Sequence, residues 1–459
     1  MSSATDSGIP MLPAERRAVA LLALIYAIRM AGLFVVLPVL ALHAGTLGGV
    51  SPKLIGLAIG IYGLTQAVLQ IPYGAWSDRY GRRRIIIIGL LVFAAGSVLA
   101  GAADTIYMLI LGRALQGAGA VAGVVMALAA DLTRESQRSK AMAAIGASIG
   151  ASFLLSIVAG PALYALVGGH GIFYFTALTA VLAVGVLQWG VPRTIMATAH
   201  PSAGEALAAA RQGRPLFGIN LGIFMLHAVL TACFVAIPGV LRDTLGLPVA
   251  EHWKIYLLAM LAGLCLMLPC LLYAEKTGRI KALLIGATLC LAICLIGLAG
   301  GYGKSLYGFT ALLCLFFTAF NALEAVFPSL VSKMAAAGRK GAALGTYATS
   351  QFLGAFCGGV TAGWALQEWG AAGVFRMTAL YALLWLPLAF GIKMLPGLVC
   401  YTVRFSPHNG QAAHSLRARL QGITGVREVS IVESEGIAYV HVDKGSFDYA
   451  AFDEVIPKT

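Results

Sequence analysis

Twelve apolar stretches, each about as long as a helix that crosses a bilayer, occupy most of this chain. A bilayer core takes about 20 apolar residues per helix. We expect spans at residues 18–42, 54–74, 84–102, 106–130, 140–167, 171–191, 216–240, 255–273, 282–303, 305–331, 341–367 and 373–392. The chain is 59% hydrophobic and 11% charged, whereas soluble domains are roughly 45–50% and 25%. The sequence therefore predicts an all-α polytopic membrane protein.

The basic residues are distributed unevenly around these spans. Because the number of spans is even, both termini lie on one side, and the loops of that side carry 18 Lys and Arg residues against 5 on the other. The positive-inside rule predicts that both termini are cytoplasmic. The first span carries Arg29 and is too long for the core of a cleaved signal peptide. Since the positive charge borders a membrane, we expect lipid as a partner and no nucleic acid.

A short charged turn joins the second and third spans. It reads Gly74-Ala75-Trp76-Ser77-Asp78-Arg79-Tyr80-Gly81-Arg82-Arg83-Arg84. This turn resembles the GxxxDRxGRR loop between helices 2 and 3 of the major facilitator superfamily of secondary transporters. The resemblance implies a twelve-helix fold of two six-helix halves around a central polar cavity.

Two features of the first half recur in the second. Phe34-Val35-Val36-Leu37-Pro38 is echoed by Phe234-Val235-Ala236-Ile237-Pro238, and the spacing of Pro72, Asp78 and Gly81 by that of Pro269, Glu275 and Gly278. Two matches in register favour a duplicated 6+6 arrangement. We expect a six-helix bundle over residues 1–192, a central cytoplasmic loop over 193–215, a second six-helix bundle over 216–397 and a cytoplasmic domain over 398–459.

Four ionisable residues lie inside spans, where charges are expensive and usually functional. They are Arg29, Arg113, His227 and Glu324, and the resemblance implies that their helices line the cavity. A carboxylate in low-dielectric surroundings can load and release a proton in the physiological range, and His titrates near neutrality. We expect Glu324 to be the leading proton carrier and His227 the second. Two alternatives are a fixed ion pair of Glu324 with Arg29 or Arg113, and direct substrate binding by Glu324.

Other residues of the predicted cavity follow from spacing or from the resemblance. Asn321 lies three residues before Glu324, on the same helix face. Arg113 and Gln116 lie in a segment that resembles the RxxQGxGxA motif of span 4, whose arginine is associated with proton handling; the glycines there are equally consistent with packing alone. Phe34 is expected to line the cavity. The Gly160-Pro161 pair resembles the helix-kinking motif of drug antiporters, without its usual trailing glycines.

The charged turn is expected to act as a conformational latch, as the resemblance implies for Gly74, Asp78, Arg79, Gly81 and Arg82. Asp131 and Arg134 are placed to pair with Arg82 and Asp78. The helix that starts near Gly341 is the expected partner of Asp78, because a helix N-terminus favours an anion. The alternative is that the turn only orients the chain in the membrane.

The composition changes after Pro396-Gly397. Alternation at Val399, Tyr401 and Val403 predicts a strand, and helical spacing follows at Leu416 and Leu420. Two further strands and a last helix, capped by Asp448, complete a β-α-β-β-α order. We expect a ferredoxin-like fold that lacks its final strand. His408, His414 and His441 lie here, but no metal-binding spacing is present, and we expect no metal.

These features predict a proton-driven efflux transporter of small molecules that works by alternating access and resides in a bacterial inner membrane. We expect a monomer whose partners are protons and an unidentified small substrate, with a further ligand or partner for the tail. No cofactor is expected, and no ATP-binding loop or set of catalytic residues is visible, so an enzyme is not expected. Two alternatives are an importer or exchanger of a sugar or organic anion, and a transport-inactive sensor that signals through its tail.

Overall fold

The computed structural model describes residues 11–192, 214–300, 304–334, 340–392, 398–404, 410–432, 437–443 and 446–455. The chain divides into two compact units, one of Leu12–Ser332 and Lys340–Ile392, the other of the remaining residues. The first unit holds both predicted six-helix bundles. Most of the predicted central loop lies outside the described residues.

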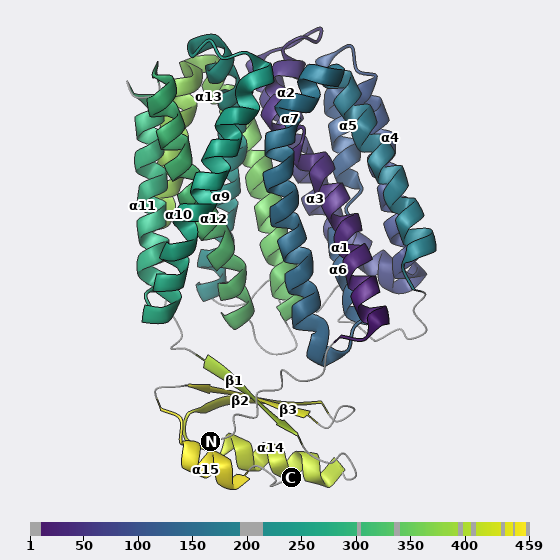
Figure 1. The fold of residues 1–459 in the computed structure, drawn as a ribbon, viewed down its shortest axis with the longest axis vertical. Helices are drawn as coiled ribbons and strands as arrows, with labels where there is room; N and C mark the ends of the chain where they lie inside the picture. Colours follow the sequence, from purple (N-terminus) through teal and green to yellow (C-terminus); the bar gives the residue numbers. More distant parts are fainter. Residues whose placement is uncertain are drawn as a thin grey trace. The chain divides into compact units, whose positions relative to one another are not determined.

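The first unit consists of helices (Figure 1). They are α1 (Pro13–Phe34), α2 (Leu37–Ala44), α3 (Pro52–Tyr80), α4 (Arg82–Gly101), α5 (Ile106–Ala118), α6 (Ala122–Asp131), α7 (Glu135–Gly185), η1 (Val186–Gly190), α9 (Arg214–Gly239), η2 (Val240–Thr244), η3 (Val249–Glu251), α10 (His252–Thr277), α11 (Ile280–Ala299), α12 (Leu306–Met334) and α13 (Lys340–Gly391). We call α1 to η1 the N-half and α9 to α13 the C-half. The end where α3 begins is the Pro52 end, and the end where it finishes is the Asp78 end.

Ten helical segments of the described residues are long and apolar enough to cross a membrane. Two of them, Lys140–Gly190 and Ala343–Gly391, are 51 and 49 residues long. Each contains two helices that meet at a glycine with positive φ, Gly168 (69°) and Gly370 (65°). Four predicted spans therefore appear as two joined pairs, because a glycine turns the chain without a loop.

Two predicted spans are interrupted. The first is divided at Val35 and Val36 into α1 and α2, where Pro38 lacks the N–H that would continue the hydrogen-bond ladder. The fourth is divided at Gly119–Val121 into α5 and α6. This second break leaves backbone carbonyls near the middle of the bundle for side chains to bind.

The two halves share backbone features at equivalent positions. Gly81 and Gly278, which correspond in the sequence repeat, both have positive φ, 94° and 70°. Gly168 and Gly370 form a second such pair. A glycine is needed at each, since other residues adopt positive φ at a cost. The same turns at the same places support the predicted duplication.

The halves contact each other through α3 and α13, with α13 also packed against α9. Glycines allow the backbones of α3 and α13 to approach closely. A Cβ added at Gly60 would lie 2.7 Å from the Phe356 carbonyl oxygen, and one added at Gly363 would lie 2.6 Å from the Pro52 carbonyl oxygen. Lys53 and Glu368 form an exposed ion pair of 3.1 Å beside this contact. The Pro52 ends of the halves are thus closely packed.

The second unit contains the tail domain. Its elements are β1 (Leu398–Arg404), α14 (Gly410–Gln421), β2 (Val426–Val432), β3 (Ile437–Asp443) and α15 (Tyr449–Val455). The strands form one antiparallel sheet in the order β1-β3-β2. Val403, Leu420 and Val440 belong to a separate apolar core, and Asp448 caps α15 by accepting a hydrogen bond from the Ala451 N–H at 3.0 Å. The predicted β-α-β-β-α order and this cap are confirmed.

Candidate functional site

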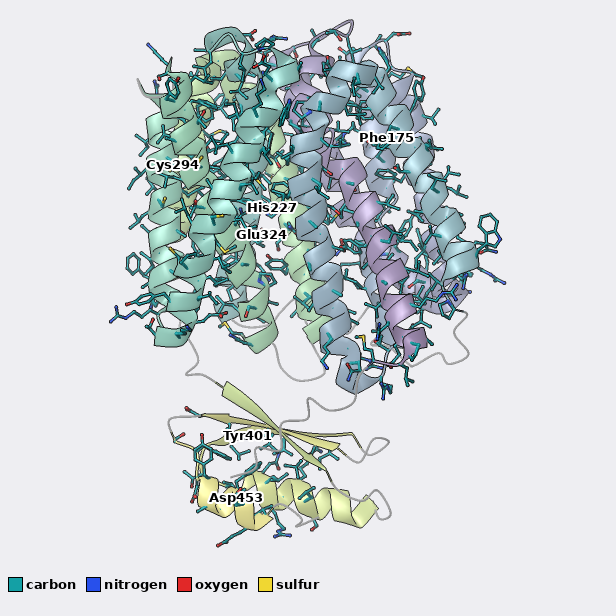
Figure 2. The ribbon with its side chains drawn as sticks, viewed as in Figure 1. Phe175, His227, Cys294, Glu324, Tyr401 and Asp453 are labelled. Atoms are coloured by element: carbon teal, nitrogen blue, oxygen red, sulfur yellow. The ribbon has the colours of Figure 1, made fainter. Side chains whose placement is uncertain are left out.

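The four intramembrane ionisable residues lie in two separate groups, one in each half. Arg29 and Arg113 belong to the N-half, where they surround Tyr62. His227 and Glu324 belong to the C-half and lie close together on α9 and α12 (Figure 2). The predicted alternative, a fixed ion pair of Glu324 with Arg29 or Arg113, is not what the structure shows. Among the described residues, no Lys or Arg lies within ion-pair distance of Glu324.

The C-half group, which we call the carboxylate cluster, comprises His227, Glu324, Tyr347 and Gln351. The Gln351 amide nitrogen lies 2.7 Å from His227 Nε2 and 3.3 Å from Glu324 Oε1. Since this NH2 group has two hydrogens and only donates, it can serve both acceptors at once. In a neutral His227 the remaining hydrogen then lies on Nδ1, which is 3.9 Å from Glu324 Oε2.

The surroundings of this cluster combine burial with access. Glu324 lies well inside α12, yet 35% of its side chain is solvent-accessible, against 13% for His227. Tyr347 lies one turn before Gln351 on α13, is buried, and has a hydroxyl with no hydrogen-bond partner. Asn321 lies one turn before Glu324 and is half-buried. The Glu324 side chain is thus partly exposed, although its Oε2 atom is buried and has no hydrogen-bond partner among the described residues.

A row of aromatic rings connects this cluster to the N-half. Phe320 lies 6.0 Å from His227 and 6.1 Å from Phe153 of α7, measured between ring centroids. Phe153 in turn contacts Phe34 at 4.9 Å. The predicted cavity residue Phe34 thus lies at the N-half end of this row, where α1 ends.

The N-half group, which we call the arginine cluster, comprises Arg29, Tyr62, Gln66, Arg113 and Gln116. Arg29 donates from Nη2 to Gln66 Oε1 and, at 3.3 Å, to the Gly119 carbonyl at the α5–α6 break, which also accepts from the Val121 N–H. Arg113 donates to Gln116 Oε1 at 2.8 Å and to the Ala58 carbonyl at 3.4 Å. The guanidinium carbons lie 6.0 Å and 5.0 Å from the centre of the Tyr62 ring.

Gln116 does not line an accessible cavity, contrary to prediction. It is 0% exposed, its oxygen accepts from Arg113, and its nitrogen donates to Ser97 Oγ at 2.7 Å. Both ends of the amide are therefore used within the N-half. Gln116 holds the Arg113 guanidinium in place.

The charged turn forms an ion-pair network at the Asp78 end. Arg82 pairs with Asp78 at 2.5 Å and with Asp131 at 3.0 Å, and it donates to Ser77 Oγ at 2.6 Å. Gly81 supplies the positive φ that turns α3 into α4. The Arg79 guanidinium lies 5.4 Å from the Tyr80 ring. Gly74 has no neighbour within 4 Å of an added Cβ, so packing in this conformation does not require a glycine there.

Arg134, expected to join this network, instead lies against Glu15. Its backbone N–H and its Nε both donate to Glu15 Oε1 at 2.9 Å, and Nη2 donates to Oε2 at 2.9 Å. This joins the beginning of α1 to the beginning of α7. The expected contact of Asp78 with the helix that begins near Gly341 stays a prediction, because the side chains at the start of α13 lie outside the described residues.

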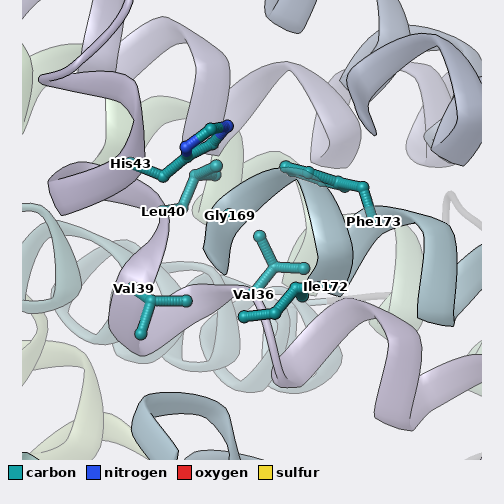
Figure 3. Close-up of a pocket in the computed structure, with 7 residues that line it drawn as sticks. All are labelled: Val36, Val39, Leu40, His43, Gly169, Ile172 and Phe173. Atoms are coloured by element: carbon teal, nitrogen blue, oxygen red, sulfur yellow. The ribbon is translucent and has the colours of Figure 1, made fainter. Parts of the chain in front are cut away.

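Gly160 and Pro161 lie within α7, which continues through both. A Cβ on Gly160 would lie 2.8 Å from Pro38 Cγ, so this glycine lets α7 pack against the break between α1 and α2. A small hollow nearby is lined by Val36, Val39, Leu40, His43, Gly169, Ile172 and Phe173 (Figure 3). It has no room for a water molecule, which identifies it as a packing gap.

Metal binding finds no support among the residues that the structure describes. No group of three or more His, Cys, Asp and Glu side chains there could hold a metal ion. Of the tail histidines, His408 lies outside the described residues, as do the side chains of His414 and His441.

The helices, the charged turn and the repeat all agree with comparison to known protein families. The family profile described as Major Facilitator Superfamily matches residues 22–358. The chain belongs to the Major Facilitator Superfamily.

Individual relatives narrow this assignment. The inner membrane transport protein YajR of Escherichia coli (strain K12) is 43% identical over 443 residues, which cover 94% of this chain and 95% of the relative. The similarity to YajR covers almost the whole of both chains, and the present chain is a multi-pass inner-membrane protein. An uncharacterized transporter, BU466 of Buchnera aphidicola, is 33% identical over 73% of this chain and 86% of its own. The multidrug resistance protein MdtH of Yersinia enterocolitica is 25% identical over 77% and 90%.

Solved structures show the same fold. The human organic anion transporter MFSD10 superposes with a TM-score of 0.63 at 20% identity, over 82% of this chain and 100% of that one. A bacterial homologue of the human lysosomal transporter Spinster gives a TM-score of 0.67 at 14% identity, over 83% and 97%. At such low identity these likenesses concern the fold alone.

Sequence reasoning missed five residues of the site. Gln66, Gln351 and Glu15 bind predicted charges, and Tyr62 and Tyr347 lie beside them. A usable signal was present for the glutamines, since a buried charge needs a hydrogen-bond partner and long amides inside spans are natural ones. Glu15 gave no such signal, because an acid in the first turn of a helix is ordinary.

Proposed function

We propose that this protein is a proton-coupled secondary transporter that exports small molecules by alternating access. Membership of a transporter family and similarity to the multidrug resistance protein MdtH support export as the direction. The observation that carries proton coupling is the carboxylate cluster. Glu324 is a carboxyl group deep in α12 whose side chain is partly exposed, and its partners Gln351 and His227 carry no fixed charge.

The geometry supports a two-residue proton site. When Glu324 is ionised, the Gln351 NH2 group donates to the carboxylate, and the Nδ1–H of a neutral His227 lies on the side of Oε2. When Glu324 takes up a proton, its electrostatic attraction for His227 weakens, and so does its hydrogen bond from Gln351. Arg29 and Arg113, which the sequence also predicted to take part in proton coupling, lie in the other half and form no ion pair with this acid among the described residues. Phe34 and Asn321 are the proposed substrate contacts beside this site.

The remaining features fit alternating access. Counting Lys140–Gly190 and Ala343–Gly391 as two spans each turns the ten apolar segments into twelve proposed crossings. The excess of basic residues at the Asp78 end supports cytoplasmic termini. The network of Asp78, Arg82 and Asp131, with Gly81 at its turn, is the proposed latch. Gly74 and Arg79 belong to the same motif. Arg134 joins the beginnings of α1 and α7 through its ion pair with Glu15. Gly160-Pro161 is the proposed kink in α7.

The tail is proposed to be a ferredoxin-like domain, of which the described residues form three strands. The antiparallel order β1-β3-β2 is the order of the first three strands in that fold. A second candidate function, transport of an organic anion, is favoured by the two buried arginines.

The test is proton flux in vesicles. Wild type and Glu324→Gln are reconstituted with a pH-sensitive dye, and cationic dyes and organic anions are added under an imposed pH gradient. Compound-dependent proton movement is expected in wild type and should be absent in Glu324→Gln. Glu454→Gln, which changes an exposed glutamate of the tail in the same way, serves as the control. Undiminished coupling in Glu324→Gln would contradict the proposal.

A further inference from the structure

The arginine cluster places two guanidinium groups in the interior of the N-half without a carboxylate. Arg29 is 1% exposed and Arg113 is 0% exposed. Their hydrogen-bond acceptors are amide oxygens, backbone carbonyls and the Met30 sulfur, all uncharged. Neither arginine has an ion-pair partner among the described residues. Burying an unpaired charge at this depth is costly, and the cost here is incurred twice.

The acids of the N-half cannot neutralise these charges. In the described part of the N-half every acid stands at or beside the end of a helix, and these are Glu15, Asp78, Asp104, Asp131 and Glu135. Glu15 is engaged by Arg134, and Asp131 by Arg82. The described acids of the N-half therefore form no ion pair with these two buried positive charges.

The same cluster contains donors with nothing to bind. Arg29 Nε, Arg113 Nη2, Gln66 Nε2 and the Tyr62 hydroxyl are buried and have no hydrogen-bond partner. Three of these four groups can only donate, and the tyrosine hydroxyl can also donate. A set of unsatisfied donors beside two cations is suited to an anion, since charge-assisted hydrogen bonds are the strong ones.

The size of the ligand follows from the burial of its surroundings. Tyr62 is 2% exposed and Gln66 is 0% exposed, so a bulky organic molecule cannot reach the cluster in this conformation. We propose that Arg29 and Arg113 together bind one small anionic group, of the size of chloride, next to Tyr62. The group is either a free inorganic anion or a small carboxylate, and both present the same chemistry to the guanidiniums.

Anion binding to the full-length protein tests the proposal. The protein is purified in detergent with sodium gluconate, whose anion is too large for this enclosed site. Binding of ³⁶Cl⁻ is measured by equilibrium dialysis, and Tm is followed while chloride replaces gluconate at constant ionic strength. Saturable binding and a saturable rise in Tm are expected. A parallel titration with acetate, with ³⁶Cl⁻ displacement as its readout, distinguishes a carboxylate from an inorganic anion as the preferred source.

Variants assign the site. Arg29→Gln and Arg113→Gln each remove a charged donor and should weaken chloride binding about 10- to 100-fold. Arg376→Gln, which removes an exposed arginine of the C-half, should leave binding unchanged. Tyr62→Phe deletes only an unpartnered hydroxyl, so it keeps the fold and should still weaken binding several-fold.

The outcomes are distinct from those of the flux assay, because binding is measured without transport. Chloride or acetate binding that is lost in the arginine variants supports the site, whether or not Glu324 carries protons. Equal Tm in chloride, acetate and gluconate with no bound ³⁶Cl⁻ would overturn the proposal. So would binding that is the same in Arg29→Gln, Arg113→Gln and Tyr62→Phe as in wild type.

Discussion

Replacing Gly56 by alanine should push α3 and α13 apart at the Pro52 end. A Cβ at Gly56 would lie 2.7 Å from Gly363 Cα and closer still to the Gly359 carbonyl oxygen. These are backbone atoms, which cannot rotate away as a flexible side chain can. Forcing an extra carbon into a close-packed contact costs about 1–3 kcal/mol. Because the cost applies only to the conformation in which the two helices touch, it should reduce the population of that conformation roughly 5- to 150-fold.

Cross-linking across the Lys53–Glu368 ion pair measures this population. Both residues are changed to cysteine in a variant from which the eight native cysteines have been removed, and a short bismaleimide reagent is added. The initial rate of cross-linking should fall in Gly56→Ala. Gly286→Ala is the matched control, since nothing lies within 4 Å of a Cβ added there. If Gly56→Ala cross-links as fast as the control, the α3–α13 contact does not have the tight geometry described above.

Three further predictions concern the ion pairs and the tail. Arg82→Ala should lower stability by roughly 1–3 kcal/mol, because it removes the ion pairs of Arg82 with Asp78 and with the Asp131 carboxylate, which is 7% exposed. Arg82→Lys should lower Tm less in the same thermal unfolding assay. A double-mutant cycle of Glu15→Gln and Arg134→Gln should give a coupling energy of about 0.5–3 kcal/mol, and additive effects on Tm would contradict the contact. Asp448→Ala should cost α15 about 1 kcal/mol, seen in the full chain as faster hydrogen exchange confined to residues 449–455, whereas exchange unchanged from wild type would argue against the cap.

The apolar pattern and the charged turn could be predicted from the sequence because each is local. A bilayer imposes a minimum helix length, and a turn such as the one at Gly81 needs a glycine wherever φ is positive. The strands and helices of the tail followed from alternation and spacing in the same way. The divisions of α1–α2 and α5–α6 were missed, because hydropathy measures how apolar a stretch is and does not register a break in its backbone.

The grouping of the intramembrane charges could not be predicted, because it depends on which helix faces which. Sequence reasoning placed Arg29, Arg113, His227 and Glu324 around one cavity. The structure separates them into two groups. Gln66 and Gln116 bind the arginines within the N-half, and Gln351 contacts the acid and the histidine within the C-half. Each charged residue is thus hydrogen-bonded by the amide of a glutamine. For Gln66 and Gln351 the partner lies many residues away in the chain, which a local sequence pattern does not show.

The α3–α13 contact connects these two clusters physically. Helix α3 carries Tyr62 and Gln66 of the arginine cluster. Gly63, which follows Tyr62 in the same helix, lies against the Phe352 carbonyl of α13. Gln351, which holds Glu324 and His227, is the residue immediately before Phe352. Any motion that separates α3 from α13 must therefore displace Gln351 relative to the arginine cluster. Because the contact is made by backbone atoms, it cannot yield by side-chain rotation, and separating the halves has to change the surroundings of the acid and of the arginines in the same step.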